Sequence, residues 1–525
     1  MTPFAPPEVD WKGLSPVLVV LGAAVVGMLV EAFVPQRARR VTQLTLALLA
    51  TAAALVLVAW QWSELIAGPD ATGGAVLLGG AYVEDGPALF AQGTIAVLAF
   101  LGLLVIADRT SVREDAFAPQ AAAVPGSPYE AQVRRAGLVQ TEVYPLVLFA
   151  VGGMLVFPAA GDLLTMFIAL EVLSLPLYIL AGLARRRRLL SQEASLKYFL
   201  LGAFASAFFL FGAALLYGYA GTVSLTGIAT AVPTISGADG LLLAGVVLVL
   251  VGLLFKVGAV PFHAWTPDVY QGAPTPITGF MAACTKVAAF AALLRVVYVV
   301  VAPLTWDLEA VLWGVTALTV VVGSVIALVQ TDVKRMLAYS SIAHAGFLLT
   351  GVVSLVQEGI SSVLFYLLAY GLGTIGAFGV VTLVRERDAH GNITGEATHL
   401  AQWAGLGRRN PGVAVAFALF LLSFAGIPLT AGFIGKFAVF TAAAQGGAWP
   451  LVVLGVLASA AAAVFYVRVI VLMFFTEPDG DETVVVRSEG LSAVAIGVTA
   501  VGVLLLGVLP GPVLDLAGQA ARFLP

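Results

Sequence analysis

Apolar runs of about 20 residues follow one another along almost the whole of this chain of 525 residues. A helix needs about 20 mostly apolar residues to cross the hydrocarbon core of a bilayer, so each run is long enough to span a membrane. Hydrophobic residues make up 60% of the chain and charged residues 11%, whereas about a quarter of the residues in a soluble domain are charged. The sequence therefore predicts an integral membrane protein without a soluble domain of ordinary size.

The runs predict an all-α polytopic fold with fourteen transmembrane helices. Helices 4 and 5 are separated only by the short turn "AAGD", and a further apolar segment at 432–445 is too short to span. The predicted spans are 15–34, 42–62, 87–107, 142–160, 161–183, 193–219, 239–262, 275–302, 309–330, 336–355, 361–384, 412–431, 450–475 and 490–515.

Basic residues in the loops test this count, because Lys and Arg collect in the cytoplasmic loops of membrane proteins. Every second predicted loop is basic except the one at 263–274, and the loops between them, outside the half-length segment, contain neither Lys nor Arg. One missed or extra span would destroy this alternation, so the sequence predicts fourteen helices with both termini on the outer side. The loop residues concerned are Arg37, Arg39, Arg40, Arg109, Arg113, Arg134, Arg135, Arg185 to Arg188, Lys334, Arg335, Arg385, Arg387, Arg408, Arg409 and Arg487.

Several classes of function are excluded by what the chain lacks. The net charge of −4 gives no reason to expect nucleic-acid binding. The lone Cys284 excludes an internal disulfide, a thiolate metal site and a CxxC redox pair. No GxGxxG motif follows a strand, no HExxH motif occurs, and four scattered histidines do not predict a haem or an iron–sulfur site. We therefore expect neither a metal nor a redox cofactor in this chain.

A few ionisable residues remain inside the predicted spans. A charge at the bilayer centre costs at least about 2.5–3.5 kcal/mol even on insertion scales, so such residues indicate function. One of them is acidic: Glu171 lies near the middle of helix 5. We expect Arg295 and Arg468 to be structural ion partners first. The basic residues inside spans are Lys197, Lys256, Lys286, Arg295, Lys436 and Arg468.

Lys256 ends the apolar run of helix 7 in "FKVGAVPFHAW", where Gly258 and Pro261 interrupt the helix. Unwound backbone and water can solvate a charge in mid-membrane, so this break is typical of a proton site. The alternative is a snorkelling lysine whose ammonium reaches the headgroups, and such a lysine needs no break. His263 follows the break and is either the next member of a proton relay or an ordinary interfacial histidine.

Three further lysines differ in how deep they lie. Lys286 is too far inside helix 8 to reach either headgroup layer comfortably. Lys436 follows a second interruption, "FAGIPLTAGFIGKF", and the same argument applies to it as to Lys256. Lys197 opens helix 6 close to a basic loop, so snorkelling or an ion pair with Glu193 competes with a role in a relay.

His344 lies mid-span in "YSSIAHAGFLL", beside Ser340 and Ser341. This string suits a hydrogen-bonded polar chain between the lysines, and the alternative is a histidine bonded to a neighbouring backbone carbonyl. A lysine in a low-dielectric site can change its protonation state near neutral pH when a nearby charge changes. The sequence thus predicts a lateral proton wire of Glu171, Lys256, Lys286 and Lys436, supported by Lys197, His263 and His344.

The two helix interruptions suggest internal symmetry. They lie in helices 7 and 12, five helices apart, so the two broken helices must run in opposite directions. Paired broken helices in an inverted repeat point to the ion site of a transporter. We predict helices 1–3 with an inner loop in 1–140, a first five-helix repeat (helices 4–8) in 141–303, an inverted second repeat (helices 9–13) in 304–475, and helix 14 in 476–525.

Six strings in helices 5 to 12 carry a resemblance to a known family, and the string in helix 7 is the most specific. The pattern resembles the antiporter-type subunits of respiratory complex I and of the Mrp sodium/proton antiporters over about helices 4 to 13. The strings are "ALEVLSLPLYIL" with Glu171, "EASLKYFLLGAF" with Lys197, "FKVGAVPFHAWTPDVYQGAPTP" with Lys256, "TKVAAF" with Lys286, "DVKRMLAYSSIAHAGF" with His344 and "LSFAGIPLTAGFIGKF" with Lys436.

The resemblance implies roles for these residues. In the family, the glutamate of helix 5 and the lysine of helix 7 form a charge pair, and the lysine of helix 8 is the central relay. A lysine or glutamate of helix 12 ends the path, and the M-type subunit of complex I carries glutamate where this chain has Lys436. The chain departs from the family in a long Ala/Pro-rich inner loop at 110–140, which we expect to meet a neighbouring subunit or a peripheral arm.

The resemblance also implies a function: a proton-translocating membrane subunit of an NADH:quinone oxidoreductase in the bacterial inner membrane, coupled to quinone reduction elsewhere in the complex. FMN, iron–sulfur clusters and quinone are then expected in other subunits, and the partners are neighbouring antiporter-like and small membrane subunits. One alternative is an Mrp-type cation/proton antiporter subunit. Another is a structural membrane subunit that does not pump, against which the buried charges argue.

Overall fold

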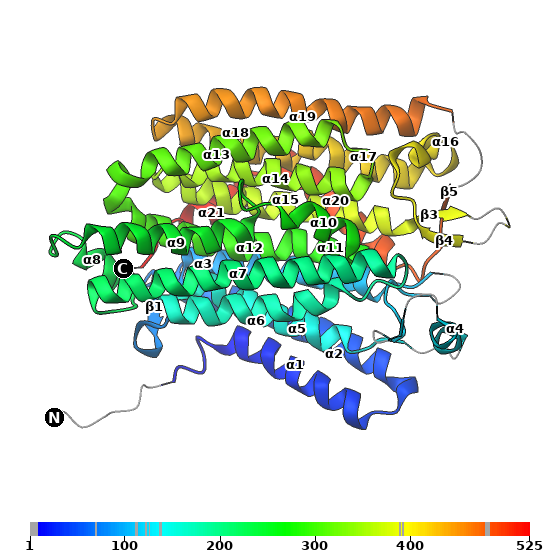
Figure 1. The fold of residues 1–525 in the computed structure, drawn as a ribbon, viewed down its shortest axis with the longest axis horizontal. Helices are drawn as coiled ribbons and strands as arrows, with labels where there is room; N and C mark the ends of the chain where they lie inside the picture. Colours follow the sequence, from blue (N-terminus) through cyan, green and yellow to red (C-terminus); the bar gives the residue numbers. More distant parts are fainter. Residues whose placement is uncertain are drawn as a thin grey trace.

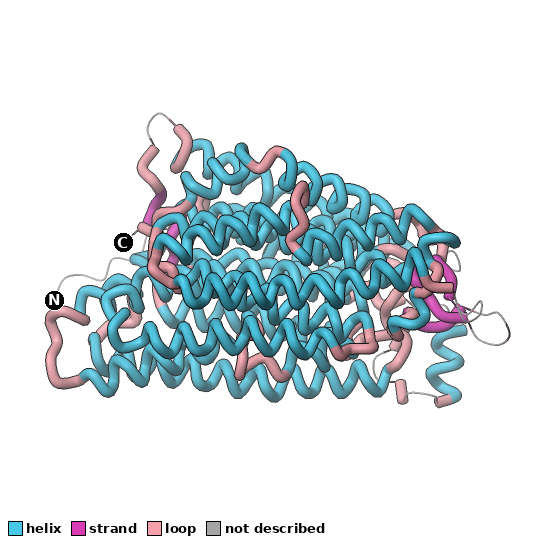
Figure 2. Tube along the Cα trace, turned by 90° about the horizontal axis from the view of Figure 1, so that it is seen from above, coloured by secondary structure: helices cyan, strands magenta, loops and turns pink. Residues whose placement is uncertain are grey.

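The structure, a computed structural model, describes residues 9–68, 71–110, 114–120, 123–124, 127–135, 139–387, 390, 393–477 and 483–524. Long helices run side by side along one axis, and most loops gather at the two ends of the molecule (Figure 1). The view from above shows the same arrangement, with the short strands at the ends (Figure 2). The amide of Leu524 reaches Asp85, so the C-terminal end of the described chain lies beside the loop before the third span.

The fourteen predicted spans are present. Eleven described helices are long and apolar enough to cross a membrane. Three further segments complete the set: α5 (Val143–Val156) with η2 (Phe157–Ala159), α14 (Val333–Val352), and α17 (Pro411–Ala425), while the half-length segment is α18 (Ala431–Gln445). The long spans are α1 (Ser15–Phe33), α2 (Gln36–Leu65), α3 (Gly86–Ala107), α6 (Leu163–Ala181), α7 (Arg188–Ala220), α9 (Asp239–Val257), the run of α11 (Thr275–Phe280), η3 (Met281–Thr285), α12 (Lys286–Val296) and η4 (Val297–Val301), α13 (Thr305–Leu328), α15 (Gln357–Leu383), α19 (Trp449–Phe475) and α20 (Leu491–Val508).

Short elements occupy the two ends, and the strands among them were not expected from the sequence. One end carries an antiparallel pair of strands, β1 and β2, and the other a sheet in the order β4-β3-β5. The short elements are η1 (Leu78–Gly80), η5 (Ala302–Leu304), η6 (Leu400–Trp403), α4 (Pro128–Arg135), α8 (Leu225–Ala231), α10 (Trp265–Gly272), α16 (Leu406–Arg409), α21 (Gly511–Ala520), β1 (Gly74–Leu77), β2 (Tyr82–Asp85), β3 (Val384–Arg387), β4 (Ile393–Glu396) and β5 (Thr483–Val485).

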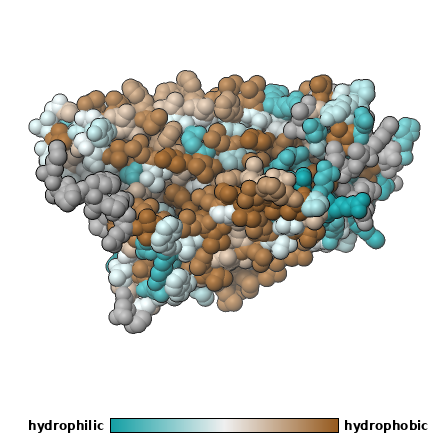
Figure 3. Space-filling model, turned by 90° about the horizontal axis from the view of Figure 1, so that it is seen from below, coloured by the Kyte–Doolittle hydropathy of each residue, from teal (hydrophilic) through white to brown (hydrophobic). Residues whose placement is uncertain are grey.

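The helices differ sharply in burial. Nearly every residue of α3 and α15 is buried, so these two helices lie at the centre of the bundle. In contrast, α1, α7 and α19 expose large apolar side chains such as Phe33, Phe204 and Val464. The face seen in Figure 3 is hydrophobic along the middle of the molecule and more hydrophilic toward its ends. An apolar belt of this extent is what contact with lipid hydrocarbon requires.

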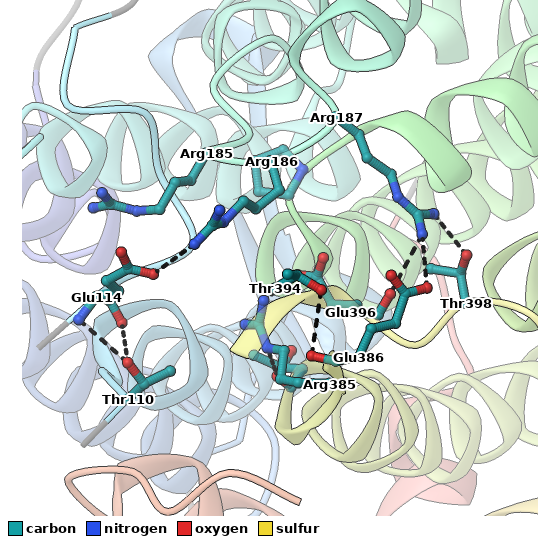
Figure 4. Close-up of polar contacts among 12 residues, drawn as sticks. Thr110, Glu114, Arg185, Arg186, Arg187, Arg385, Glu386, Thr394, Glu396 and Thr398 are labelled. Carbon is teal, nitrogen blue, oxygen red and sulfur yellow. Dashed lines mark hydrogen bonds and ion pairs between the residues drawn. The ribbon is translucent and has the colours of Figure 1, made fainter. Parts of the chain in front are cut away.

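The basic loops gather at one end, as their alternation predicts. Arg186, in the loop between α6 and α7, pairs with Glu114 at 3.2 Å, and the neighbouring Arg187 pairs with Glu386 of β3 at 3.3 Å (Figure 4). Loops that are far apart in the sequence therefore meet at this end, which we call the basic end. Arg113 lies outside the described residues.

The inverted repeat is visible where α6 and α14 begin. The side chain of Asp162 accepts a hydrogen bond from the amide of Thr165 at 2.7 Å, and Asp332 accepts one from the amide of Arg335 at 3.0 Å. Each helix start also pairs with a later loop through two backbone hydrogen bonds. These are Leu163 N to Val223 O and Leu225 N to Gly161 O in one repeat, and Val333 N to Thr398 O and Leu400 N to Thr331 O in the other. Because α6 starts beside β2 and α14 starts beside β4, the two helices run in opposite directions.

The predicted breaks in helices 7 and 12 have the same backbone geometry. Gly258 ends α9 at φ 78°, and Gly426 ends α17 at φ 82°. The amide of Gly258 donates to Phe255 O at 3.1 Å, and the amide of Gly426 donates to Ser423 O at 3.0 Å. This is the Schellman motif, whose left-handed residue is usually glycine. The second halves of the two broken helices are α10 and α18.

A buried ion pair holds the helix that carries Lys286. Arg295 donates to both carboxylate oxygens of Asp85, at 2.7 and 3.0 Å, and to Pro158 O at 2.9 Å. The side chains of Arg295 and Asp85 are only 2% and 0% exposed. Arg295 is thus the structural ion partner that we expected, and it fixes α12 against the start of α3.

Replacing Arg295 by methionine should destabilise the protein by about 3–5 kcal/mol, because it leaves Asp85 as an unpaired buried charge. The double variant Asp85→Asn with Arg295→Met removes both charges and keeps a side chain that can cap α3, so it should be more stable than Arg295→Met alone. Thermal unfolding of the purified variants measures this. A double variant that is less stable than the single one would contradict the assigned pair.

Candidate functional site

Lys256, the last but one residue of α9, points into the protein and not toward the membrane surface. Its side chain is buried, and its Nζ atom donates to Ser174 Oγ of α6 at 2.7 Å and to Tyr198 OH of α7 at 3.2 Å. The ring of Tyr198 lies 5.3 Å from the ammonium. The geometry rules out snorkelling, because the ammonium ends on two protein hydroxyl groups and not at a headgroup layer.

Glu171 lies on α6 one turn before Ser174, the residue that binds Lys256. No ion pair within 4.0 Å joins Glu171 to Lys256 or to another cation in the described part of the chain, and Glu171 Oε1 is buried without a hydrogen-bond partner. The charge pair that the resemblance implies is therefore not closed in this structure. In the described structure Glu171 therefore does not neutralise Lys256 by contact.

Lys286 is held by backbone carbonyl groups. It follows the π-helical turn η3, and its buried Nζ atom donates to Ser341 O of α14 at 2.8 Å and to Val257 O at 3.4 Å. Val257 is the last residue of α9, and the last carbonyl groups of a helix have no partner within it. The amine of Lys286 therefore lies at the broken end of helix 7. Its acceptor there, Val257, is the residue that follows Lys256.

His344 is fixed by two tyrosines. Its Nδ1 atom lies 2.6 Å from Tyr366 OH and its Nε2 atom 3.2 Å from Tyr466 OH, and the whole side chain is buried. Its ring also lies 4.9 Å from the ring of Tyr370, which in turn lies 5.6 Å from the Lys286 ammonium. The partners of His344 are hydroxyl groups and not the backbone carbonyl of the alternative interpretation.

Lys436 lies on the end of the other broken helix. Its buried Nζ atom donates to Ala425 O, the last carbonyl of α17, at 3.1 Å and to Ser459 Oγ of α19 at 2.7 Å. The ring of Phe347 lies 4.7 Å from the ammonium. The argument made for Lys256 does not transfer directly to Lys436, because Lys436 follows its break in the sequence whereas Lys256 precedes its break and binds Ser174 and Tyr198. The amine that matches Lys436 at the broken helix end is that of Lys286.

These groups form one contiguous set across the middle of the bundle. It begins at Glu171, one helical turn from the Ser174 that binds Lys256, and continues to Lys286 through Val257, the residue after Lys256. Contacts through the rings of Tyr370 and Phe347 then lead to His344 and to Lys436. The helices that contribute are α6, α9, α12, α14 and α18, so both repeats are joined. The four residues predicted for proton transfer are therefore brought together with His344.

Two predicted supporting residues stand apart. Lys197 pairs with Glu193 and with Asp268, each at 2.6 Å, and its side chain is 41% exposed. His263 lies beyond the break and is half-buried, and no hydrogen bond or ion pair joins it to the other candidates in the described residues. Arg468 is exposed and donates to Leu328 O at 3.4 Å, without the acidic partner that we expected among the described residues.

A second cluster of largely buried charged residues, Lys334, Arg385 and Glu396, lies at the basic end. Lys334 is 4% exposed and donates to Ala273 O at 2.7 Å. Burial raises the pKa of the Glu396 carboxyl, but Arg385 and Lys334 more than offset this and lower it to about 2. Glu396 is therefore a fixed anion at any physiological pH, and Arg385 pairs with it at 3.4 Å. The pair of Arg385 and Glu396, drawn in Figure 4, joins β3 to β4.

Sequence reasoning missed the hydroxyl groups that bind the site. Tyr198, Tyr366, Tyr466 and Ser459 each contact a predicted site residue, yet tyrosines in apolar spans look like core residues. The signal that could have found them is their position on spans that carry few other polar groups. In the described part of the chain no group of three His, Cys, Asp or Glu side chains could hold a metal ion.

Comparison with known proteins places this geometry in context. Residues 160–461 match the family described as NADH:quinone oxidoreductase/Mrp antiporter, TM. The chain is 69% identical to NADH-quinone oxidoreductase subunit N of Beutenbergia cavernae over 528 residues, which cover 99% of each chain.

Two solved structures share the fold. A chain of respiratory complex I from Thermus thermophilus, solved with bound aureothin, matches with a TM-score of 0.75 and 35% identity, covering 96% of this chain and 99% of that one. A chain of the Mrp complex from a Dietzia species matches with a TM-score of 0.75 and 22% identity, covering 98% of this chain and 97% of that one. At 22% identity the second similarity concerns the fold alone.

Replacing Gly426 by alanine should lower thermal stability more than replacing Gly221. Both glycines have a positive φ, which costs another residue about 1–2 kcal/mol. At Gly426 a Cβ atom would also meet Lys436 Cδ at 3.0 Å, whereas nothing lies within 4 Å at Gly221. Unfolding temperatures of the purified variants provide the measurement, and equal losses at the two sites would contradict the described approach of Lys436 to the break.

Proposed function

The chain belongs to the NADH:quinone oxidoreductase/Mrp antiporter family, and we propose that it translocates protons as the N-type membrane subunit of a respiratory complex I. Its relatives are named as subunits N of NADH-quinone oxidoreductases, and a complex I structure shares its fold. A lysine at position 436, where the M-type subunit carries glutamate, is expected for this type. The predicted spans 4 to 13, which are α5 to α19 in the structure, are arranged as expected for it. Within the complex the chain supplies the proton path, and NADH oxidation and quinone reduction occur in other subunits.

One observation supports the role in proton transfer: some buried charged groups have an ion-pair partner, and others have none among the described residues. Arg295 is paired with Asp85 by two short hydrogen bonds. Lys256, Lys286 and Lys436 have only neutral oxygen acceptors, and in the described residues no carboxylate lies within 4.0 Å of them. A buried pair is neutral as a whole, whereas an unpaired buried group is costly in its charged form and so can exchange its proton.

The geometry suggests how a proton moves along the set. Lys256 and the acceptor of Lys286 are neighbours at the end of α9: Lys256 carries the first amine, and Val257 supplies a carbonyl to the second. His344 can accept at one ring nitrogen and donate at the other, and tyrosine hydroxyl groups occupy both of its sides. Glu171 at one end acts on Lys256 through the low-dielectric interior. A change of charge at Glu171 would then pass along the set to Lys436.

An Mrp-type cation/proton antiporter subunit is the second candidate. It shares the fold, but the Mrp chain from Dietzia is only 22% identical, against 69% for the relative named subunit N. A structural subunit without transport is a third candidate, and the unpaired buried lysines argue against it.

We further propose that the chain resides in the bacterial plasma membrane with both termini on the outer side. The basic end would then face the cytoplasm, as the distribution of Arg and Lys favours. Its partners would be neighbouring antiporter-like and small membrane subunits, and FMN, iron–sulfur clusters and quinone would be bound elsewhere in the complex.

Lys286 provides the test of the relay. Arginine keeps the charge of lysine but has a pKa above about 12, so it cannot release a proton. Lys286→Arg should therefore lose NADH-driven proton translocation to nearly the same extent as Lys286→Ala, on the order of tenfold or more. Translocation is measured with the assembled complex in proteoliposomes and normalised to NADH oxidation.

Lys256→Ala in the same complex serves as the matched comparison, and it should also pump poorly. Full pumping by the Lys286→Arg variant would rule out a relay role for Lys286. Full pumping by both Lys286→Ala and Lys256→Ala would rule out proton transfer through this chain.

A further inference from the structure

Asp268 of α10 binds two cations that come from different helices. Its Oδ2 atom accepts from Lys197 of α7 and its Oδ1 atom accepts from Arg335 of α14, each at 2.6 Å. Arg335 also reaches Gln271 Oε1 at 3.2 Å. Hydrogen bonds between charged groups are shorter and stronger than those between neutral groups. One carboxylate therefore ties α10, the second half of broken helix 7, to both of its neighbours.

Helices α10 and α7 also meet through aromatic rings. Trp265 of α10 stacks on Tyr198 of α7, with ring centroids 4.7 Å apart and an interplanar angle of 8°. Trp265 Nε1 donates to Phe255 O at 2.9 Å, which fixes α10 to the end of α9. Adjacent residues of α7, Lys197 and Tyr198, are thus held by two residues of α10 that lie one turn apart.

Tyr198 connects this contact to the proton site. Its hydroxyl group lies 3.2 Å from Lys256 Nζ and is one of the two oxygen atoms that bind this amine. If α10 shifts relative to α7, the ring of Tyr198 moves and the hydroxyl group leaves Lys256. The position of α10 therefore bears directly on the contacts of Lys256.

The inverted repeat gives Asp268 a notable position. Asp268 follows the break glycine Gly258 by ten residues, and Lys436 follows the break glycine Gly426 by ten residues. Both residues thus lie in the second half of a broken helix, Asp268 in the first turn of α10 and Lys436 in the second turn of α18. Lys436 binds the broken helix of its own repeat, whereas Asp268 binds Lys197 in its repeat and Arg335 in the other.

We propose that Asp268 is a positioning residue for proton transfer: by binding Lys197 and Arg335 it holds α10 against α7 and α14 and keeps the Tyr198 hydroxyl group on Lys256. This proposal rests on the proposed function of Lys256. It also changes the role of Lys197, which acts as a cation that anchors Asp268 and does not itself pass protons. No atom of Asp268 meets the transferred proton.

The exposure of these side chains makes the proposal testable. Asp268, Lys197 and Arg335 are 31%, 41% and 30% exposed, and ion pairs that water reaches contribute little to stability. Variants at these positions should therefore fold and assemble. Their effect is expected on pumping, because a small misplacement of a group near a reacting centre can slow a reaction by up to about a hundredfold.

The experiment measures proton translocation per NADH oxidised by the assembled complex in proteoliposomes. Asp268→Asn should lower pumping about tenfold, and Asp268→Glu, which keeps the carboxylate, should retain at least about half of it. Asp239→Asn is the matched control, because Asp239 is an exposed carboxylate at the other end of α9. This control should pump like the unaltered complex.

Two further variants separate positioning from relay. Lys197→Arg keeps the ion pair but cannot release a proton, so it should pump normally, whereas Lys197→Met should lose about half of the activity because Arg335 still binds Asp268. Loss of pumping in Lys197→Arg would overturn the proposal, since Lys197 would then carry protons itself. These variants also decide the matter if Asp268→Asn does not assemble.

A double variant tests the connection to Lys256. Asp268→Asn combined with Tyr198→Phe should pump no worse than the weaker of the two single variants, because both changes act on the same contact. If the pumping losses of the two single variants multiplied in the double variant, the proposed connection between Asp268 and the Tyr198 hydroxyl group would be overturned. If Lys256→Ala stops pumping while Asp268→Asn pumps normally, the positioning role is wrong and the proposed function stands. If Lys256→Ala also pumps normally, the proposed function itself fails.

Discussion

Each of the two broken helices ends on a backbone carbonyl group that its own helix cannot use, and a lysine amine lies on each of them. Val257 O ends α9 and receives Lys286, and Ala425 O ends α17 and receives Lys436. A helix C-terminus carries partial negative charge, so it stabilises a cation without neutralising it. In hydrocarbon, where water cannot satisfy either group, this contact solves two problems at once: it binds the orphan carbonyl and it gives the buried amine an oxygen atom. A neighbouring helix supplies each amine with a second oxygen atom, Ser341 O of α14 for Lys286 and Ser459 Oγ of α19 for Lys436.

The charged residues of the bundle divide between holding it together and changing state. Arg295 and Lys286 lie on the same helix, yet one is closed in an ion pair with Asp85 and the other touches only carbonyl oxygens. The pair anchors α12, and the anchored helix in turn fixes the height of Lys286 against the end of α9. At the basic end, the ion pair of Glu396 with Arg385 also holds the structure together. A charge that has a partner makes a stable fold, whereas a charge without one makes a site that responds to its surroundings.

Much of this was accessible from the sequence, and the reasons differ from residue to residue. The spans and the breaks were predictable because hydrophobic length, Gly258 and Gly426 act locally. Glu171, Lys256, Lys286 and Lys436 stood out because a charge in an apolar run is costly wherever its helix packs. The contact of Lys286 with Val257 O was not predictable, because it depends on how α12 lies beside α9. Asp85 as the partner of Arg295 and the tyrosines around His344 were missed for the same reason: they are partners across helices. Lys256 and Lys436 are not equivalent, because Lys256 precedes its break and Lys436 follows its break in the sequence; the end of α9 therefore receives Lys286, whereas the end of α17 receives Lys436.

The central claim is that an exchangeable proton at the end of the set, and not merely a filled space, is needed at position 436. Proton translocation per NADH oxidised by the assembled complex in proteoliposomes tests it when Lys436→Glu is compared with Lys436→Leu. A protonated glutamate can donate to Ala425 O as the lysine does, so the account predicts that Lys436→Glu retains part of the pumping and that Lys436→Leu loses most of it. Equal pumping by the two variants would show that no exchangeable proton is required there, and the break in helix 12 would then be a feature of packing.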